Sequence, residues 1–395
     1  DVYGDMASTA PNNIRLSDLK WETKTTWNIG TDIGIFDDKF TMDINMYSQL
    51  TEDLLMKNVR IPSSTGYGAL SWKNVGSMRN QGWELNIYGN KCVKVGDFSA
   101  GFNLTLGNNV NEIVSMDETV LASLNSDFNY ENGSYLTRVQ VANAFGSIYG
   151  FRYKGVYQYS DYIPGEQESA PVARDANGNV ITDEKGNPLP MVFNYGSTTA
   201  QPYEFQGGDA IYEDVNHDGN INELDIVYLG NCNPLVTGGF GLRFYYKRWS
   251  MNMQFNYRYG SKVLNMAKMN AENMHSNSNQ SYAVNWRWRT EGDLTTIPRA
   301  LHNAGYNFLG SDRFVEDGSF CRLNYLQLSY SLGTEVAKRL GIRKATLSMS
   351  ANNLFNWTRY SGVDPEVGYG GYGLSTDNSQ TPRAKSFTCR LNVTF

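Results

Sequence analysis

Apolar and polar residues alternate along much of this chain, most regularly between Arg383 and Phe395. The apolar positions there are Phe387, Cys389, Leu391, Val393 and Phe395, separated by Ser386, Thr388, Arg390, Asn392 and Thr394. Successive side chains of a β-strand point to opposite faces of a sheet, so this pattern predicts a strand with one apolar and one polar face. We expect the apolar face to contact lipid.

The same alternation recurs in about ten further segments. They are 19–36, 40–46, 83–87, 98–106, 134–141, 147–157, 234–247, 249–259, 321–332 and 342–351. Many of these runs are longer than the five or six residues of a usual soluble strand, and they match the roughly nine to eleven residues of a tilted strand that crosses a bilayer. Length and alternation therefore favour an all-β, antiparallel transmembrane β-barrel over a soluble β-sandwich.

The connections between these strands support one orientation. Outer-membrane barrels have short periplasmic turns and long extracellular loops. If the last strand descends to the periplasm, the short connections fall on the periplasmic side, at 36–39, 91–96, 142–146, 248 and 333–341. The long connections fall outside, at 56–77, 110–133, 158–233, 260–320 and 352–382. For strand direction to alternate along the whole chain, segment 134–141, whose alternation is weak, must cross the membrane as well.

The expected total of about eleven strands is odd, whereas complete single-chain bacterial barrels have an even number. An open sheet edge is not tolerated in lipid, so we expect the remaining strands upstream of Asp1 or in another chain. The sequence begins at Asp1 in polar, loop-like residues without a signal peptide, as expected of a fragment or a processed product.

Composition is compatible with a barrel and excludes one class of partner. The mean hydropathy is -0.47 and aromatic residues make up 13%, with 26 Tyr. Half of the strand residues of a barrel face a wet lumen, and Tyr is enriched in the girdles at the bilayer interfaces, so neither value opposes a membrane location. The net charge of -6 and the absence of a basic run argue against nucleic acid.

Residues 214–225, DVNHDGNINELD, have the spacing of a calcium-binding loop. The six candidate ligands are Asp214, Asn216, Asp218, Asn220 through its carbonyl, Asn222 and Asp225, with Gly219 at the sharp turn. Asp225 departs from the EF-hand pattern, which has Glu at the twelfth place. We predict a structural Ca²⁺ in an extracellular loop; a turn stabilised by its own Asp and Asn side chains is the alternative.

The segment 260–320 combines a predicted short amphipathic helix at 263–275 with a Trp–Arg cluster at 286–289. Exposed Trp and Arg side chains suit carbohydrate stacking or a partner interface, and a packed loop core explains the cluster equally well. The chain has no recognisable Ser-His-Asp, paired-carboxylate or phosphate-loop signature, so we do not expect an enzyme.

Five stretches in this order resemble the SusC/RagA-type TonB-dependent outer-membrane transporters of Bacteroidota. They are LKWETKTTWNIGTDIGIFDDKFTMDINMYSQLTEDLL (19–55), NVGSMRNQGWELNI (74–87), GDAIYEDVNHDGNINELDIVYLGNCNP (208–234), VEDGSFCRLNYLQLSYSL (315–332) and ANNLFNWTRYSGVDPEVG (351–368). The resemblance covers nearly the whole chain. It implies that residues 1–395 are the carboxyl-terminal half of a barrel of about 22 strands, without its plug domain and first strands.

The resemblance also implies partners. A SusD-like lipoprotein would cap the outside, and 158–233, 260–320 and 352–382 are the candidate docking loops. TonB would act through an amino-terminal segment not present in this chain. Candidate substrate or partner contacts are Trp286, Trp288, Trp357, Tyr360, Tyr369 and Tyr372.

The expected function is TonB-dependent import of oligosaccharides or other oligomeric nutrients by a multi-pass protein of the bacterial outer membrane, in contact with its lipid. An oligopeptide importer of the same family is the nearest alternative. A secreted calcium-binding β-sandwich, acting as an adhesin or glycan-binding module, is the alternative from a different class.

Overall fold

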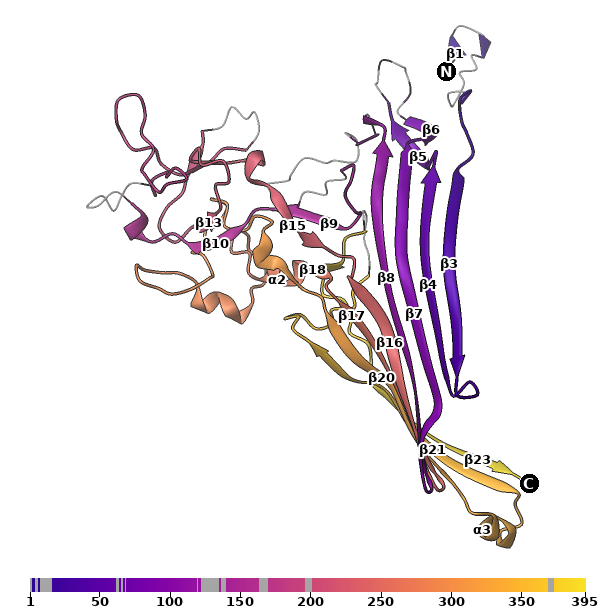
Figure 1. The fold of residues 1–395 in the computed structure, drawn as a ribbon. Coiled ribbons are helices and arrows are strands. Elements are labelled where there is room, and N and C mark those ends of the chain that lie inside the picture. The colour runs from indigo at the N-terminus through magenta and orange to yellow at the C-terminus, as the bar shows by residue number, and fades with distance from the viewer. Residues whose placement is uncertain are drawn as a thin grey trace.

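The computed structural model describes residues 2–3, 6–7, 16–61, 64, 67, 69–118, 120–121, 135, 140–162, 170–195, 201–368 and 373–395. Nine long strands form one antiparallel sheet in the order β23-β21-β20-β17-β16-β8-β7-β4-β3 (Figure 1). Among these nine strands, each pairs with the one before and the one after it in chain order, so the sheet is an up-and-down meander that is open between β3 and β23.

The nine strands are β3 (Thr23–Ile35), β4 (Phe40–Glu52), β7 (Gly76–Val95), β8 (Phe98–Met116), β16 (Val236–Tyr246), β17 (Trp249–Tyr259), β20 (Phe320–Ser331), β21 (Lys344–Thr358) and β23 (Ser386–Thr394). Short strands outside this sheet are β1 (Val2–Tyr3), β2 (Met6–Ala7), β5 (Leu55–Arg60), β6 (Ala69–Asn74), β9 (Ser147–Gly150), β10 (Tyr153–Val156), β11 (Val192–Phe193), β12 (Tyr203–Glu204), β13 (Ala210–Tyr212), β14 (Asn220–Ile221), β15 (Val227–Asn231), β18 (Lys262–Asn265), β19 (Val315–Asp317) and β22 (Thr376–Asp377). Helices whose full extent lies within the described residues are α2 (Met266–Ala271), α3 (Thr334–Arg339) and the 3-10 turns η2 (Tyr159–Asp161), η3 (Glu223–Asp225), η4 (Tyr282–Trp286) and η5 (Asp312–Phe314).

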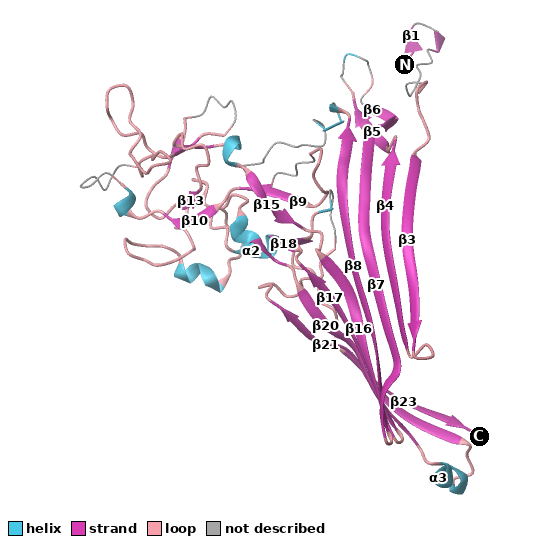
Figure 2. Ribbon diagram, viewed as in Figure 1, coloured by secondary structure: helices cyan, strands magenta, loops and turns pink. Residues whose placement is uncertain are grey.

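The tight turns between strands lie at one end of the sheet and the long connections at the other (Figure 2). The connection at Lys247 and Arg248 is a two-residue hairpin, because Tyr246 pairs directly with Trp249. Lys247 adopts a φ of 51°, the positive value that such tight hairpins require. The longest turn at this end carries α3.

Two expected membrane strands are corrected by the structure. Segment 147–157 forms β9 and β10, which pair with β15 and β13 outside the large sheet. β9 is buried along its whole length, because its apolar residues serve a loop core rather than lipid. Most of the segment 134–141 lies outside the described residues. β8 is hydrogen-bonded directly to β16, so 117–235 is one long connection and strand direction alternates correctly without either segment.

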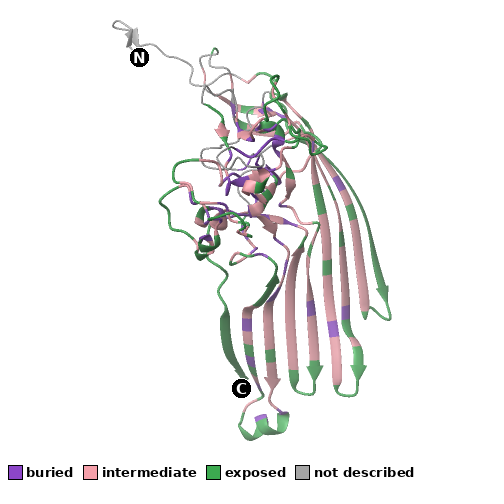
Figure 3. Cartoon of the chain, turned by 90° about the vertical axis from the view of Figure 1, so that its left-hand side faces the viewer, coloured by how far each residue is buried: buried purple, intermediate pink, exposed green. Residues whose placement is uncertain are grey.

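The long connections fold into a compact body, here named the loop lobe, made of the described residues within 140–235, 260–319 and 359–385. Buried residues concentrate in this lobe, whereas the strands are mainly half-buried or exposed (Figure 3). Its main core contains Phe151, Phe205, Tyr212, Ile221 and Leu309, which come from both of the longest connections. The lobe is therefore a small domain with its own core rather than a set of separate loops.

Helices contribute little to this architecture. Within the described residues, no helix is both long and apolar enough to cross a membrane. The predicted amphipathic helix at 263–275 is shorter than expected: α2 covers Met266–Ala271, and the preceding residues form β18. Asn265 caps α2 by accepting a hydrogen bond from the Lys268 amide at 2.9 Å.

Candidate functional site

One face of the large sheet is apolar across all nine strands because the strand register aligns the alternating residues. Leu104, Phe240 and Phe255 are direct neighbours on β8, β16 and β17, and the last two rings stack with centroids 4.3 Å apart. The same face continues to the edge strand, where Phe387 is 74% exposed. An exposed apolar surface of this extent indicates an apolar environment around the sheet.

The opposite face is lined mainly by neutral amide and hydroxyl side chains. On neighbouring strands this face carries Asn86 and Thr105, then Asn103, Gly241 and Gln254 in register. A Cβ added at Gly241 would clash with both of its amide neighbours, so these side chains lie flat over the glycine. The amide groups of this polar wall can both donate and accept hydrogen bonds.

A buried ion pair joins the two longest connections inside the loop lobe. Asp209 is fully buried, and Arg299 donates to both of its carboxylate oxygens, Nε to Oδ1 at 2.6 Å and a terminal nitrogen to Oδ2 at 3.1 Å. Tyr203 and Asn307 donate to the same carboxylate at 2.7 and 3.1 Å. Burial and then the Asp209 charge raise the pKa of Tyr203, so the phenol stays a neutral donor.

A second network fastens the connection 359–385 to the polar face of the sheet. Arg322, on β20, is 2% exposed and donates to Asp364, and its other terminal nitrogen is 3.6 Å from Glu366. Arg383 also donates to Glu366. The pKa of Asp364 is lowered: burial opposes its ionisation, but hydrogen bonds from the Glu366 amide and from Arg322 outweigh burial.

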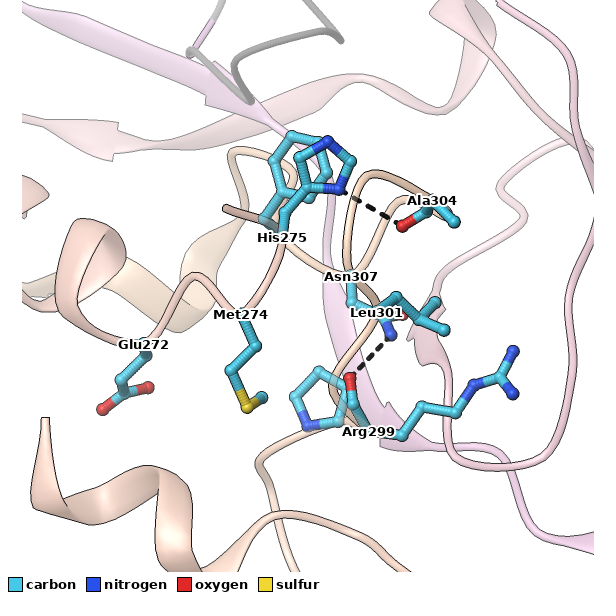
Figure 4. A pocket seen from close by; sticks show the side chains of 9 residues that line it. Glu272, Met274, His275, Arg299, Leu301, Ala304 and Asn307 are labelled. Carbon is cyan, nitrogen blue, oxygen red and sulfur yellow. Dashed lines mark hydrogen bonds between the residues drawn. The ribbon is translucent and has the colours of Figure 1, made fainter. Parts of the chain in front are cut away.

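A small cavity lies beside the Asp209 network, at the residues labelled in Figure 4. Its volume is about 10 Å³, room for about one water molecule. His275 reaches the Ala304 carbonyl with Nδ1 at 3.2 Å, and Asn307 donates to the Arg299 carbonyl at 3.2 Å. This cavity is too small for a nutrient and belongs to the packing of the lobe.

The predicted aromatic contacts separate into different environments. Trp286 is 59% exposed and packs edge-on against Tyr282, with ring centroids 4.8 Å apart. Trp288 is 5% exposed and donates from Nε1 to Gln158 at 3.1 Å. The two tryptophans therefore divide between a surface pair and the lobe core.

Two further candidates lie away from any open lumen surface. Trp357 is exposed on the apolar face, stacked with Phe355 at 5.9 Å between centroids, where bilayer contact is expected. Tyr360 is 6% exposed and donates to Asp377 at 2.7 Å, so it holds the lobe together. Tyr369 and Tyr372 lie outside the described residues.

The predicted calcium loop is closed by its own side chains. The carboxylate of Asp214 accepts hydrogen bonds from the backbone amides of Asp218 and Gly219, at 3.2 and 2.7 Å. Asp225 is fully buried and accepts from the amides of Val215 and Asn222, at 2.8 and 2.9 Å. Burial raises the pKa of Asp225, and the nearby charges of Asp214 and Asp218 add to the effect.

The other three predicted ligands share this arrangement only in part. Asn216 donates to Asp218 at 2.9 Å, Asn222 accepts from the Leu224 amide, and the side-chain oxygen of Asn220 is buried without a hydrogen-bond partner. Gly219 has the positive φ of 81° that the sharp turn requires. In the part of the chain that the structure describes, no group of three acidic, His or Cys side chains is arranged to hold a metal. Calcium binding here stays a prediction.

Sequence reasoning missed Asp209, Arg299 and Arg322. Asp209 and Arg299 are separated by 90 positions, and Arg322 and Asp364 by 42, so no local spacing links them. The one available signal was Arg322 itself, a charged residue near the start of a predicted strand whose alternation is weaker than that of its neighbours.

Comparison with known proteins agrees with this architecture. Residues 2–184 match the family model described as TonB dependent receptor-like, beta-barrel. TonB-dependent receptor P39 of Formosa agariphila is 29% identical over 100% of this chain and 37% of its own length. SusC of Bacteroides thetaiotaomicron is 27% identical over 100% of this chain and 34% of its own length.

Among solved structures, the RagAB peptide transporter matches with a TM-score of 0.67 and 22% identity, over 100% of this chain and 38% of that chain. At this identity the match shows the fold. The chain spans about a third of the length of the relatives and of that structure. The single sheet with an exposed apolar face excludes the β-sandwich alternative, and the relatives are receptors and transporters rather than enzymes. The chain is thus similar to TonB-dependent receptor β-barrels over residues 2–184 and to SusC over its whole length.

Proposed function

We propose that this chain forms part of an outer-membrane importer that carries oligomeric nutrients into the periplasm with energy delivered through TonB. The observation that carries the proposal is the division of the nine-stranded sheet into a continuous apolar face and a continuous polar face. A bilayer-embedded barrel wall needs both faces, the first against lipid and the second against an aqueous lumen.

The proposed substrate is an oligosaccharide. The polar face presents amide groups such as Asn103 and Gln254, which can donate and accept hydrogen bonds from many hydroxyls without selecting for charge. The exposed Tyr282–Trp286 pair on the lobe offers an aromatic surface for a sugar ring. An oligopeptide is the alternative, because peptide groups satisfy the same amides and the similar RagAB structure is described as a peptide transporter.

The proposed partners follow from the same orientation. The loop lobe lies at the end opposite the tight turns, which makes it the extracellular surface and the place where a SusD-like lipoprotein would form a lid. A plug domain, a TonB box and the remaining strands would belong to the part of the relatives' length that this chain does not span. In this proposal residues 1–395 are the carboxyl-terminal half of the barrel.

Uptake by intact cells tests the proposal. A strain lacking the full-length gene is compared with its complemented parent, and each is grown on defined oligosaccharides or oligopeptides as sole carbon source, with and without TonB. We expect the deletion to abolish growth on at least one oligosaccharide, and loss of TonB to have the same effect. If growth were impaired only on oligopeptides, the substrate would be an oligopeptide rather than an oligosaccharide. Uptake that does not need TonB would contradict the mechanism.

A further inference from the structure

The tight-turn end of the sheet, here named the turn rim, carries a concentration of positive charge. It consists of residues 36–39, 90–97, 247–248 and 332–344. These residues include nine basic and four acidic side chains, although the whole chain has a net charge of -6. The nine are Lys39, Lys91, Lys94, Lys247, Arg248, Lys338, Arg339, Arg343 and Lys344, and every one is exposed. The charge of the chain is therefore strongly polarised along the strand direction.

The positive charge at the turn rim is only weakly compensated within the described residues. The ion pair there joins Lys247 to Asp97 with a separation of 3.9 Å, and both side chains are more than half exposed. Lys247 also lies over the ring of Tyr246, and Lys91 over that of Tyr245, each 5.5 Å from the centroid. Such contacts orient the lysine stems along aromatic surface and leave the ammonium groups facing outward.

A band of aromatic residues on the apolar face borders the turn rim. Phe98, Tyr246, Trp249 and Tyr330 are successive neighbours on β8, β16, β17 and β20. Tyr246 is 52% and Trp249 47% exposed, and the Trp249 and Tyr330 rings lie 4.8 Å apart. Aromatic girdles of membrane barrels lie at the level of the lipid headgroups, and Lys247 follows Tyr246 directly.

We propose that the turn rim binds the phosphate groups of anionic phospholipids in the leaflet that it faces. This inference rests on the proposed membrane location of the apolar face. The aromatic band sets the depth of the sheet, and the cations just beyond it then reach the phosphate level. Each Lys or Arg near an anionic lipid surface adds to the electrostatic attraction, so several together give a marked preference for anionic over zwitterionic lipid.

Four rim cations can be neutralised together without touching a strand interior. The test variant is Lys338→Gln, Arg339→Gln, Arg343→Gln and Lys344→Gln in the full-length protein. A matched control removes the same charge from exposed positions at the opposite end, Lys57→Gln, Arg174→Gln, Lys185→Gln and Arg289→Gln. Each protein is reconstituted into phosphatidylcholine vesicles with brominated phosphatidylcholine or brominated phosphatidylglycerol. The readout is the quenching of Trp249 fluorescence by bromine. The Trp249 fluorescence is obtained by subtracting the fluorescence of the corresponding Trp249→Phe protein.

We expect the unmodified protein to prefer brominated phosphatidylglycerol several-fold, and this preference to fall to near parity in the test variant. The control should retain the full preference. Equal quenching by both lipids in the unmodified protein, or an unchanged preference in the test variant, would overturn the proposal. So would charge-dependent binding to peptidoglycan sacculi with no lipid preference. Absence of quenching even by brominated phosphatidylcholine would instead refute the membrane location.

Discussion

At the scale of single residues, the side chains that decide the structure of the loop lobe are buried polar groups with distant partners. Asp209 has four donors from three different parts of the chain, and all of them are needed because a buried carboxylate without partners is costly. Trp288 shows the converse case. The sequence is compatible with a surface cluster or with a packed loop core. The tertiary fold places the Trp288 ring in the core and Trp286 on the surface.

Replacing Asp209 by Ala should destabilise the loop lobe by about 3 kcal/mol, because Arg299 is then left half-buried without its counter-ion. Hydrogen exchange of residues 203–226 should report the loss, whereas β16 and β17 remain protected. The matched control is Arg152→Ala, which breaks the solvent-exposed pair with Glu213. Exposed pairs contribute about 1 kcal/mol or less. An equal effect of the two substitutions would show that the Asp209 network is not a structural centre.

The loop at 214–225 yields a prediction for calcium. After burial, the nearby charges of Asp214 and Asp218 raise the pKa of Asp225, and a bound Ca²⁺ should relieve this repulsion. We expect millimolar Ca²⁺ to raise the melting temperature of the full-length protein by a few degrees. The variant Asp214→Ala with Asp218→Ala should show no rise. The same response in both proteins would identify the loop as a turn held by its own side chains.

At the scale of elements, the sequence predicts the long strands well because the period-two pattern follows directly from strand geometry. All nine strands of the sheet were expected, including the hairpin of β16 and β17. The segment 147–157 was misassigned because a strand buried on both faces in a small domain is as apolar as the outward face of a membrane strand. Alternation identifies an amphipathic strand, but it does not distinguish lipid from a protein core as the surroundings of the apolar face.

The connection 359–385 should stay fastened to the sheet over the neutral range and be released by acid. The folded-state pKa of Asp364 is lower than its usual value of 3.8. Its stabilising contribution is therefore complete above that value and is lost as the pH falls through the folded-state pKa. The protection of residues 374–378 against hydrogen exchange, corrected for the pH dependence of the intrinsic exchange rate, should be constant from about pH 5 to 8, and in Asp364→Asn it should be lower throughout. Asp175→Asn, in a distant hairpin, is the control; an equal effect there would rule out the Arg322 contact as the anchor.

At the scale of the whole molecule, the proposed function assigns a role to each of three surfaces: the apolar face would contact lipid, the amide-rich face would line the lumen, and the loop lobe would face the outside. The first two follow from sequence alternation, and their assembly into one wall follows from the register of the strands. The lobe could not be predicted, because its core is built from segments far apart in the chain. The remaining strands of the proposed barrel would pair with the two described edge strands, β3 and β23.

The two faces should differ sharply in their tolerance of charge. Leu326→Arg places a cation on the apolar face in the middle of β20, opposite Met253, where a charged residue near the bilayer centre costs about 2–4 kcal/mol. Gln327→Arg changes the adjacent residue on the polar face and should cost much less. Folding of the full-length protein into vesicles, followed by urea titration, gives both values. Similar losses for the two variants would argue against lipid on one face only.

The central claim is that odd-numbered positions of β17 contact lipid and even-numbered positions do not. Its most direct test is a nitroxide scan of residues 251–256, one label at a time, in the full-length protein without other cysteines, reconstituted into vesicles. Collision with oxygen, which concentrates in the bilayer, should be high at 251, 253 and 255 and low at 252, 254 and 256. Uniform oxygen access, or a maximum at the even positions, would contradict the account of this sheet as a barrel wall.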